Sequence, residues 1–345
     1  MPRQAPRPAG KPRLLFLKSR RASFIELDQQ LLAERYDVHE LYQPGRFSDP
    51  RKVFREVLAA DVIVGWWASW HTFLPFTLSW LLRKRSLLIV GGFDTAADRA
   101  YGYGYQLGGP RAWLSRFAMR RARILMTNSE YSRQEIWRNT GIPPERVRVV
   151  YHGVPDAPAA SGPTGAKNRD QRPLVLGAGI VDRMNLDRKG WRAFVQGAAL
   201  VPEADFVLAG RHAPDGAAEE LQRLASANVR LTGWLENAEL AELYDRATVY
   251  LQPSKHEGFG VSVAEAMLAR CVPVTSRAGA LPEVVGDTGV LLDDLRPETV
   301  AAGVREGLER AAGEGAGEAA RRRVLSEFSV QRRRVGLFAL LDELR

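Results

Sequence analysis

The sequence predicts an α/β protein built from two doubly wound domains. Apolar runs of strand length alternate with segments of helical periodicity, which is the pattern of parallel βαβ units. The alternation stops between Pro155 and Pro173, where proline, alanine, glycine and charged residues dominate, and then restarts. The length of 345 residues fits two such domains.

The first half alternates strand with helix from its first apolar run onward. Its strand candidates are short and largely apolar, because helices cover both faces of a parallel sheet. We predict strands at 13–18, 38–42, 61–67, 86–90, 124–127 and 147–151. Helical patterns occupy 24–35, 51–60, a segment ending at 83–85, 113–122 and 130–139.

The second half repeats the pattern and ends in helices. Strands are predicted at 174–177, 205–209, 229–232, 249–252, 272–275 and 289–292. Helices are predicted at 191–200, 217–226, 237–246, 262–270, 297–313 and 319–327. The resulting division is a disordered basic tail (1–13), a first domain (14–154), a linker (155–173), a second domain (174–329) and a final helix (330–345).

The positive charge is confined to the first half. The chain carries a net charge of +9, but residues 1–160 hold 25 basic and 14 acidic side chains, whereas residues 161–345 hold 24 and 26. A basic half attracts nucleic acid, anionic lipid or phosphorylated substrates, although a solvated arginine-rich surface is an equal alternative. A single cysteine, Cys271, excludes a disulfide framework and a cysteine-based zinc site. The arginine-rich N-terminus lacks an apolar signal segment, so we expect a cytoplasmic protein.

Residues Val62 to Leu82 form an uncharged stretch of 21 residues that is long enough to cross a membrane. Gly65, His71 and Pro75 interrupt it, which favours a buried strand followed by an amphipathic helix. Its four tryptophans lie beside a basic cluster, so contact with the inner face of an anionic membrane is an alternative to core packing. A true membrane span is the third alternative.

The segment Pro253–Glu265 (PSKHEGFGVSVAE) carries the most specific chemistry. Gly258 and Gly260 let the backbone turn sharply after an apolar strand, and the following helix presents free N–H groups to an anion. Glu257 and Glu265 flank this turn and can accept hydrogen bonds from sugar hydroxyls. Alternatively, Ser262 and Glu265 form a capping box, with Glu265 bonding back to the helix start.

Arg183 and Lys189 lie on the predicted strand-to-helix connection GAGIVDRMNLDRKGW. Two cations at this position can reach a diphosphate, the arginine by bidentate bonds and the lysine as a point charge. The alternative is a surface loop in which these charges pair with Asp182 and Asp187.

The second half resembles the nucleotide-sugar-binding domain of retaining GT-B glycosyltransferases, in the large family-four group. The similar segments, in the order and spacing of that family, are DRMNLDRKG, FVLAGR, VRLTGW, LAELYDRATVYLQPS, EGFGVSVAE and GALPEVVGDTGVLL. The resemblance is strongest over 174–292. NSEYSRQEI and VVYHGV extend it into the first half, which would bind the acceptor.

The resemblance implies a role for each matched residue. Arg183 and Lys189 would hold the donor diphosphate and stabilise the departing phosphate. Glu265 would bind the ribose, and Glu257 would bind the donor sugar. The remaining donor-binding candidates are Thr232, Gly233 and Trp234 beside the base, and Gly258, Phe259, Gly260 and Val261 beside the sugar and its phosphate.

The implied fold is GT-B, in which two Rossmann-like domains face a cleft, with a C-terminal helix that can cross back to the first domain. The implied reaction transfers a hexose, with retention, from a nucleotide-diphosphate sugar to a hydroxyl acceptor such as a glycan, a lipid-linked sugar or a natural product. No further cofactor and no metal are expected, since the chain lacks an Asp-x-Asp motif. A nucleic-acid- or membrane-binding protein on a degenerate GT-B fold is the alternative, but no nucleic-acid-binding motif is found.

The chain departs from the family on the acceptor side. The loop KSRRAS lacks the usual glycine pair, and Gly91-Gly92-Phe93-Asp94 replaces a segment that often holds a histidine. Asp94 is therefore a catalytic candidate, and its alternative is a turn or cap residue. His152 stands where asparagine is common, and we interpret it as domain packing. The tyrosine-rich loop at 101–105 is a candidate lid over the cleft, or a surface turn.

Overall fold

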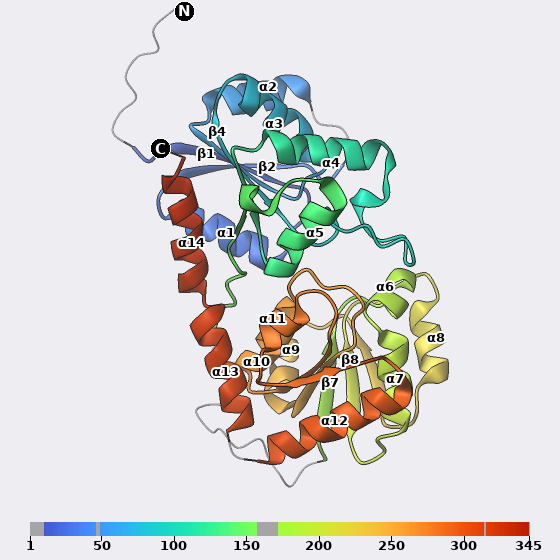
Figure 1. Cartoon of the computed structure of the whole chain (residues 1–345). Coiled ribbons are helices and arrows are strands. Elements are labelled where there is room, and N and C mark those ends of the chain that lie inside the picture. Colours follow the sequence, from blue (N-terminus) through green and yellow to red (C-terminus); the bar gives the residue numbers. More distant parts are fainter. Residues whose placement is uncertain (1–9, 46–48, 157–171, 314, 345) are drawn as a thin grey trace, which may run out of the picture.

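The computed structural model describes residues 10–45, 49–156, 172–313 and 315–344, which form two α/β domains stacked end to end (Figure 1). Within these residues, each domain contains one sheet of six parallel strands. The first sheet has the order β2-β1-β3-β4-β5-β6, with β1 Arg13–Lys18, β2 Asp37–Tyr42, β3 Val62–Trp66, β4 Arg85–Val90, β5 Ile124–Thr127 and β6 Val147–Val149. The second has the order β12-β11-β10-β7-β8-β9, with β7 Leu174–Ala178, β8 Asp205–Ala209, β9 Val229–Gly233, β10 Val249–Gln252, β11 Val272–Ser276 and β12 Val290–Leu292.

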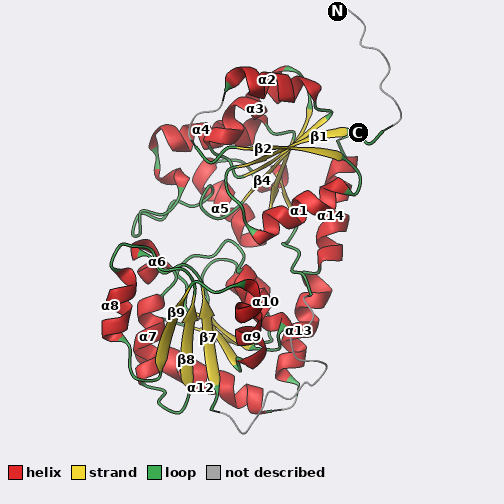
Figure 2. Ribbon diagram, turned by 180° about the vertical axis from the view of Figure 1, so that it is seen from behind, coloured by secondary structure: helices red, strands yellow, loops and turns green. Residues whose placement is uncertain are grey.

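Helices cover both faces of each sheet, as the sequence predicts for parallel strands (Figure 2). Those of the first domain are α1 Ser23–Ala33, α2 Pro50–Ala59, α3 Trp70–Leu81, α4 Gly109–Arg121 and α5 Glu130–Thr140. The second domain holds α6 Arg183–Arg188, α7 Trp191–Ala199, α8 Ala217–Leu224, α9 Asn237–Arg246, α10 Val261–Leu268, α11 Leu281–Val285, α12 Pro297–Ala312 and α13 Ala316–Glu327. The last helix is α14 Val330–Asp342.

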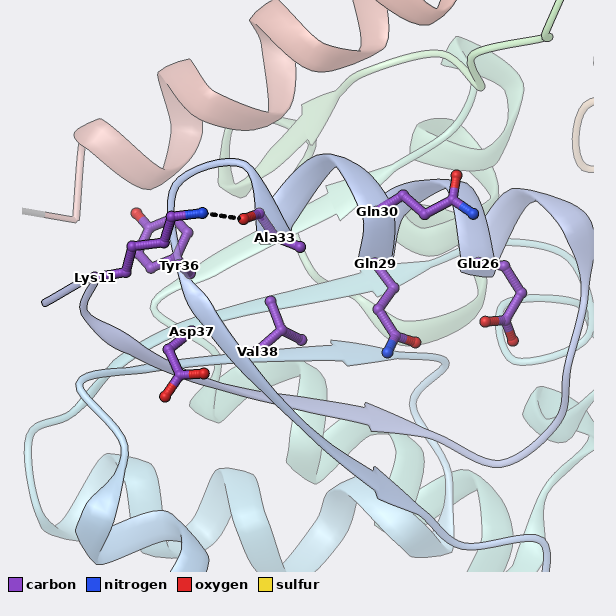
Figure 3. Close-up of a pocket in the computed structure, with 8 residues that line it drawn as sticks. All are labelled: Lys11, Glu26, Gln29, Gln30, Ala33, Tyr36, Asp37 and Val38. Atoms are coloured by element: carbon purple, nitrogen blue, oxygen red, sulfur yellow. Dashed lines mark hydrogen bonds between the residues drawn. The ribbon is translucent and has the colours of Figure 1, made fainter.

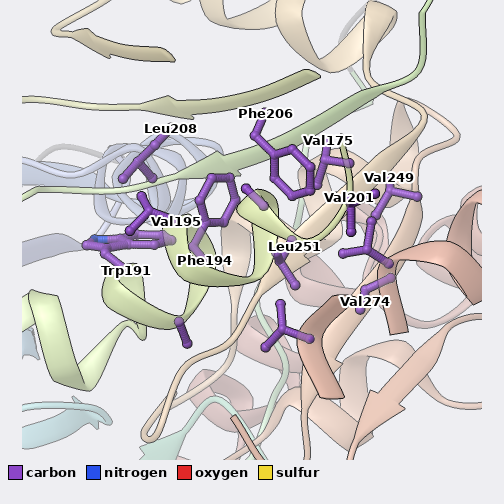
Figure 4. Packing of buried hydrophobic residues seen from close by; sticks show 14 of the residues in the cluster. Val175, Trp191, Phe194, Val195, Val201, Phe206, Leu208, Val249, Leu251 and Val274 are labelled. Atoms are coloured by element: carbon purple, nitrogen blue, oxygen red, sulfur yellow. The ribbon is translucent and has the colours of Figure 1, made fainter. Parts of the chain in front are cut away.

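The core of the second domain shows how the sequence positions a functional loop. Trp191 and Phe194, on the first turn of α7, stack edge to face, and Phe194 meets Phe206 of β8 in the same way (Figure 4). Gly177 in β7 makes room for this cluster, since a Cβ there would lie 2.8 Å from the Phe194 ring. The packing fixes the start of α7 and therefore the loop that immediately precedes it.

The C-terminal helix α14 packs on the first domain, which confirms the predicted crossing (Figures 1 and 2). Leu337 and Phe338 join the core formed by β1, β3 and β4. Arg333 forms a buried bidentate ion pair with Asp28 of α1, at 2.9 and 2.6 Å. The second half of the chain thus ends as part of the first domain.

The uncharged stretch Val62–Leu82 forms the buried strand β3 and the helix α3, as the periodicity predicts. Trp66 is buried in the sheet, whereas Trp80, Leu81 and Leu82 at the end of α3 are exposed. Among the described residues no helix is both long and apolar enough to cross a membrane, so the transmembrane alternative was wrong for this segment. The predicted tail (1–13) and linker (155–173) lie largely outside the described residues.

Two short helices occupy segments predicted to be irregular. Helix α6 lies in the expected strand-to-helix loop, and the side chain of Asp182 caps it by accepting a hydrogen bond from the Asn185 amide at 2.8 Å. Helix α11 lies between the predicted strands at 272–275 and 289–292, where no helix was expected, with Pro282 in its first turn. Of the two, α6 contributes Asn185 and Arg188 to the cavity between the domains.

Candidate active site

A cavity of about 480 Å³ lies between the two domains. Its walls are loops that follow β1, β3 and β4 of the first sheet and β7 and β10 of the second. The carboxyl ends of both sheets therefore face the same space, which is where open parallel sheets bind ligands. A second hollow of similar size lies on the first domain, beside α1 and β2 (Figure 3). It is lined by Lys11, Glu26, Gln29, Gln30, Ala33, Tyr36, Asp37 and Val38, and it offers no comparable chemistry.

The glycine turn forms the floor of the cavity on the side of the second domain. Gly260 has φ 101° and is the N-cap of α10, so the helix begins at the cavity wall. Gly258 approaches the first domain so closely that a Cβ would lie 3.0 Å from the Gly92 amide nitrogen. The N-terminus of α10 thus directs its amides and its positive dipole end towards the cavity, where the sequence predicts an anion.

Lys189 and Glu257 form an ion pair at the cavity wall, with 2.5 Å between Nζ and Oε1. Burial acts to raise the pKa of Glu257, but the positive charges of Lys189 and Arg188 outweigh it and hold this pKa below its usual value. Gly190 makes the approach possible, since a Cβ there would overlap the Pro253 carbonyl at 1.9 Å. The ion pair brings together two residues that were predicted from separate segments of the sequence to bind the donor.

Arg183 does not reach the cavity, which corrects the prediction that Arg183 and Lys189 face the same diphosphate. It begins α6, is 55 % exposed and forms an ion pair with Glu220. Because five helical residues turn the chain by about 500°, Arg183 and Arg188 point in directions roughly 140° apart. The structure therefore places Arg188, and not Arg183, in the cavity wall beside Lys189.

Arg188 is only 9 % exposed and is held rigidly. Its guanidinium donates to Asn185 Oδ1 at 2.6 and 3.0 Å and to the His256 carbonyl at 3.1 Å. Its Cζ lies 4.6 Å from the centroid of the Tyr103 ring, which belongs to the first domain. Sequence reasoning missed this arginine because it treated α6 as a flexible loop, although Asp182 before RMNL is a recognisable N-cap signal.

Glu265 lines the cavity from the second turn of α10. The helix begins at Gly260 without a side-chain cap, so the capping-box alternative was wrong. Burial raises the pKa of Glu265 to about 7, although a hydrogen bond from the Tyr244 hydroxyl opposes the shift. A half-buried carboxyl aimed at a polar cavity is suited to hydrogen bonding with a ligand hydroxyl.

Asp94 lines the same cavity from the first domain and is 1 % exposed. Its carboxylate accepts hydrogen bonds from the Ala68 and Gly91 amides at 2.9 and 3.0 Å. Burial raises its pKa to about 7 despite these bonds. Asp94 therefore caps two loops, as the second predicted alternative has it, and it also lines the cavity, so its catalytic role stays a prediction.

The remaining predicted residues are divided between the cavity and its surroundings. Gly258, Phe259, Gly260 and Val261 line it, and so do Tyr103 and Tyr105 of the predicted lid. Thr232 and Gly233 end the edge strand β9 and Trp234 follows it, and none of the three is among the residues that line the cavity. Trp234 is 67 % exposed.

His152 is buried between the domains, as predicted. Its ring contacts Phe24 and Trp66 of the first domain and Phe259 of the second, with centroids 4.8, 5.8 and 5.1 Å away. The same ring also lines the cavity. Its principal contacts are therefore those of a packing residue at the domain boundary.

Three contacts between the domains were not predicted. His256 Nε2 lies 2.7 Å from Glu135 Oε1, with both side chains buried. The hydroxyl of Ser129 donates to the Gly258 carbonyl at 2.7 Å. The Glu283 carboxylate accepts from the amides of Glu130 and Tyr131 at the start of α5. These bonds fix the glycine turn against the first domain.

No group of three or more histidine, cysteine, aspartate or glutamate side chains that could hold a metal ion occurs among the described residues. The charges that face the cavity on the side of the second domain are those of Arg188, Lys189, Glu257 and Glu265. An anion entering here meets two cations and a helix N-terminus, while hydroxyl groups meet two carboxyls.

Two protein families match the chain. The family described as "Glycosyltransferase Family 4" matches residues 32–157, and "Glycosyl transferases group 1" matches residues 175–310. The chain is 28 % identical over 202 residues to the O-antigen chain mannosyltransferase B of Escherichia coli, covering 54 % of this chain and 52 % of the relative. It is 31 % identical over 212 residues to the alpha-maltose-1-phosphate synthase of Mycolicibacterium smegmatis, covering 55 % and 53 %. The matched region thus spans about half the length of these curated relatives.

Solved structures share the fold over the whole chain. Sucrose-phosphate synthase from Thermosynechococcus elongatus has a TM-score of 0.74 at 18 % identity, covering 97 % of this chain and 99 % of that one. Anabaena Alr3699/HepE, solved in complex with UDP and glucose, has the same score and identity, covering 96 % and 99 %. At this identity the likeness shows the fold. The curated relatives are named as a transferase and a synthase, which gives the nucleic-acid-binding or scaffolding alternative no support.

Proposed function

The chain belongs to the GT-B glycosyltransferases of the family-four type, and from this premise we propose that it transfers a sugar from a nucleoside diphosphate sugar to a hydroxyl acceptor. The observation that carries the proposal is the Lys189–Glu257 pair beside the glycine turn and the N-terminus of α10. Cations and helix amides suit a diphosphate, and a charged carboxylate between them suits the hydroxyls of the attached sugar.

The donor would lie along the wall of the second domain. Lys189, Arg188 and the first amides of α10 would hold the diphosphate, and Glu265 would accept hydrogen bonds from the ribose. Glu257, which stays ionised because of the neighbouring cations, would accept hydrogen bonds from the sugar. We place the base beyond the cavity, towards Thr232–Trp234, because β9 ends on the same side of the sheet.

The reaction would break the bond between the anomeric carbon and the phosphate oxygen, and form one between that carbon and the acceptor oxygen. Lys189 and Arg188 would stabilise the negative charge that develops on the departing diphosphate. We propose that this phosphate takes the acceptor proton on the same face of the sugar, so that the configuration is retained without a covalent carboxylate intermediate. Asp94 would position the acceptor from the first domain.

The relatives support a hexose donor and a role in glycoconjugate synthesis. One is named as a mannosyltransferase of an O-antigen chain, another as an alpha-maltose-1-phosphate synthase. Solved neighbours contain UDP, or UDP-glucose. We further propose that the reaction requires no metal, because Lys189 and Arg188 supply positive charge at the diphosphate.

A donor screen tests the proposal. The melting temperature of the native chain is measured with UDP, GDP and ADP and with their sugars, and the stabilising sugar nucleotide is then assayed for transfer. We expect one nucleoside diphosphate to raise the melting temperature, because only a ligand of the native state does so. The anomeric configuration of the product, read by NMR, tests retention.

Two lysine variants complete the test. Lys189→Met should lower kcat/KM for the donor at least tenfold, which corresponds to about 1.4 kcal/mol of transition-state stabilisation. Lys52→Met, at an exposed position on α2, is the matched control and should behave as the native chain. Normal turnover by a folded Lys189→Met protein would contradict the assignment of the donor site.

A further inference from the structure

Helices α3 and α4 lie side by side on the first domain (Figure 1). Aromatic side chains of the two helices contact one another. Phe73, Trp80 and Leu81 recur on one side of α3 at the spacing of a helix face, and Trp113 and Phe117 do so on α4. The ring centroids of Phe73, Trp113 and Phe117 are 5.2 to 5.8 Å apart. We call the surface made by these five residues and Arg121 the α3–α4 face.

This face exposes large apolar side chains to an unusual degree. Leu81 is 62 % exposed, Trp113 is 58 % exposed and Trp80 is 51 % exposed. Single exposed apolar residues are common on proteins, but neighbouring tryptophans and leucines on two packed helices form a patch, and patches of this kind mark interaction surfaces.

The segment that carries the face has a large excess of positive charge. Between Val62 and Ser129 the chain holds nine basic residues and only two acidic ones, Asp94 and Asp98. Asp94 is buried in the cleft, so it does not neutralise the surface. In the part of the chain that the structure describes, no ion pair is found for the eight arginines of this segment. Their charge is therefore free to act on an external partner.

Aromatic and cationic groups share one layer. The Cζ atom of Arg121 lies 4.3 Å from the ring centroids of both Trp80 and Phe117. Tryptophan side chains with adjacent arginines are the combination that suits the boundary between lipid headgroups and acyl chains, because the rings enter it and the guanidinium groups bind phosphate.

The helices of the α3–α4 face begin near the mouth of the cleft. A hollow of about 250 Å³ is lined by Trp70 and His71 at the start of α3 and by Arg111 of α4. It shares Arg20 and Tyr105 with the main cavity. The two helices that carry the face therefore begin beside the first-domain side of the cleft, although no residue of the face lines this hollow.

We propose that the α3–α4 face docks the protein on a lipid bilayer that carries anionic headgroups. Charge complementarity selects this partner: a second copy of the chain would oppose two arginine-rich surfaces, and a neutral bilayer would leave the arginines without counter-charge. Docking in this orientation places the first-domain side of the cleft near the membrane, where a lipid-linked hydroxyl acceptor is within reach. The docking itself does not depend on the proposed transfer reaction.

Vesicle flotation tests the proposal with the full chain. We compare vesicles of pure phosphatidylcholine with vesicles that also contain about 30 % phosphatidylglycerol, at low and high salt. The native chain should float only with the anionic vesicles, and high salt should weaken its binding. Failure to bind them at low salt would overturn the proposal.

Two pairs of variants separate the apolar from the electrostatic contribution. Trp80→Ser with Trp113→Ser should lower the vesicle partition coefficient at least tenfold, whereas Trp137→Ser, at a comparably exposed tryptophan of α5, should leave it unchanged. Arg83→Glu with Arg85→Glu should also lower it at least tenfold. Arg223→Glu with Arg322→Glu, at exposed positions of the second domain, provides the charge-matched control.

The pattern of losses decides the result. The melting temperature of each variant confirms that it is folded, and this is expected because all substituted positions are exposed. The vesicle partition coefficient could instead fall equally in the two double arginine variants and stay unchanged in the double tryptophan variant. This result would show non-specific attraction of a basic protein and would overturn the proposed docking face. The proposal would also be overturned if the protein bound a DNA duplex as strongly as the vesicles and if the variants weakened both kinds of binding equally.

Discussion

Replacing Arg188 should damage donor binding far more than replacing Arg183, although the sequence alone favoured Arg183. Methionine keeps most of the aliphatic stem and removes the guanidinium, whose Cζ lies over the Tyr103 ring. A charged hydrogen bond is worth about 1.5–3 kcal/mol, so Arg188→Met should lower kcat/KM for the donor roughly 10- to 150-fold. Arg183 is 55 % exposed in a surface ion pair, and such pairs contribute about 0–1 kcal/mol. Arg183→Met should therefore change kcat/KM less than about fivefold.

The assay must separate phosphate binding from a loosened loop, because Arg188 also holds Asn185 and the His256 carbonyl. Calorimetric titration of nucleoside diphosphate and of the bare nucleoside makes this distinction. Arg188→Met should weaken the diphosphate at least tenfold and leave the nucleoside nearly unchanged, which corresponds to the loss of about 1.4 kcal/mol or more at the phosphates. Equal weakening of both ligands, or a larger effect of Arg183→Met, would refute the assignment.

Three further outcomes are expected. Burial raises the pKa of Asp94 and of Glu265 to about 7, above their ordinary values near 4, so their contribution to stability is fully present below about pH 4 and is lost as the pH rises from there through about 7; Asp94→Asn should flatten the fall in melting temperature between about pH 4 and pH 7. Arg333→Met should lower the free energy of unfolding by about 3–5 kcal/mol in urea titrations, because it leaves the Asp28 carboxylate buried without a counter-charge. Transfer in excess EDTA should match the untreated rate, and a loss that Mg²⁺ restores would contradict the proposed metal independence.

The donor side of the fold was the most predictable part of the molecule. The strand before the glycine turn, the turn itself and α10 are adjacent in sequence, so local pattern fixes their arrangement. Gly258 and Gly260 are needed at a domain contact and at a positive φ, and both requirements leave a signal in the sequence. Glu257 and Glu265 follow from the same segment, and both line the cavity.

The arginine of the site could not be placed with the same certainty, because its position depends on a helix of only six residues. If 183–188 were an extended loop, Arg183 and Lys189 could both reach the cavity. Once Asp182 caps α6, the turn of the helix directs Arg183 to Glu220 and brings Arg188 to the wall. One N-cap hydrogen bond thus determines which cation lines the site.

The contacts that close the cleft illustrate a different limit, since they join residues more than a hundred positions apart. Ser129 has the sequence signature of a helix N-cap, and in the structure it caps α5. Its hydroxyl also donates to the Gly258 carbonyl, and Glu283 accepts from the next two amides of the same helix. The free amides of α5 are satisfied by the other domain, so closure stabilises a helix end that is already formed. The start of α5 therefore binds Gly258 and Glu283 of the second domain. The two domains are held in register by hydrogen bonds that no local pattern in the sequence reveals.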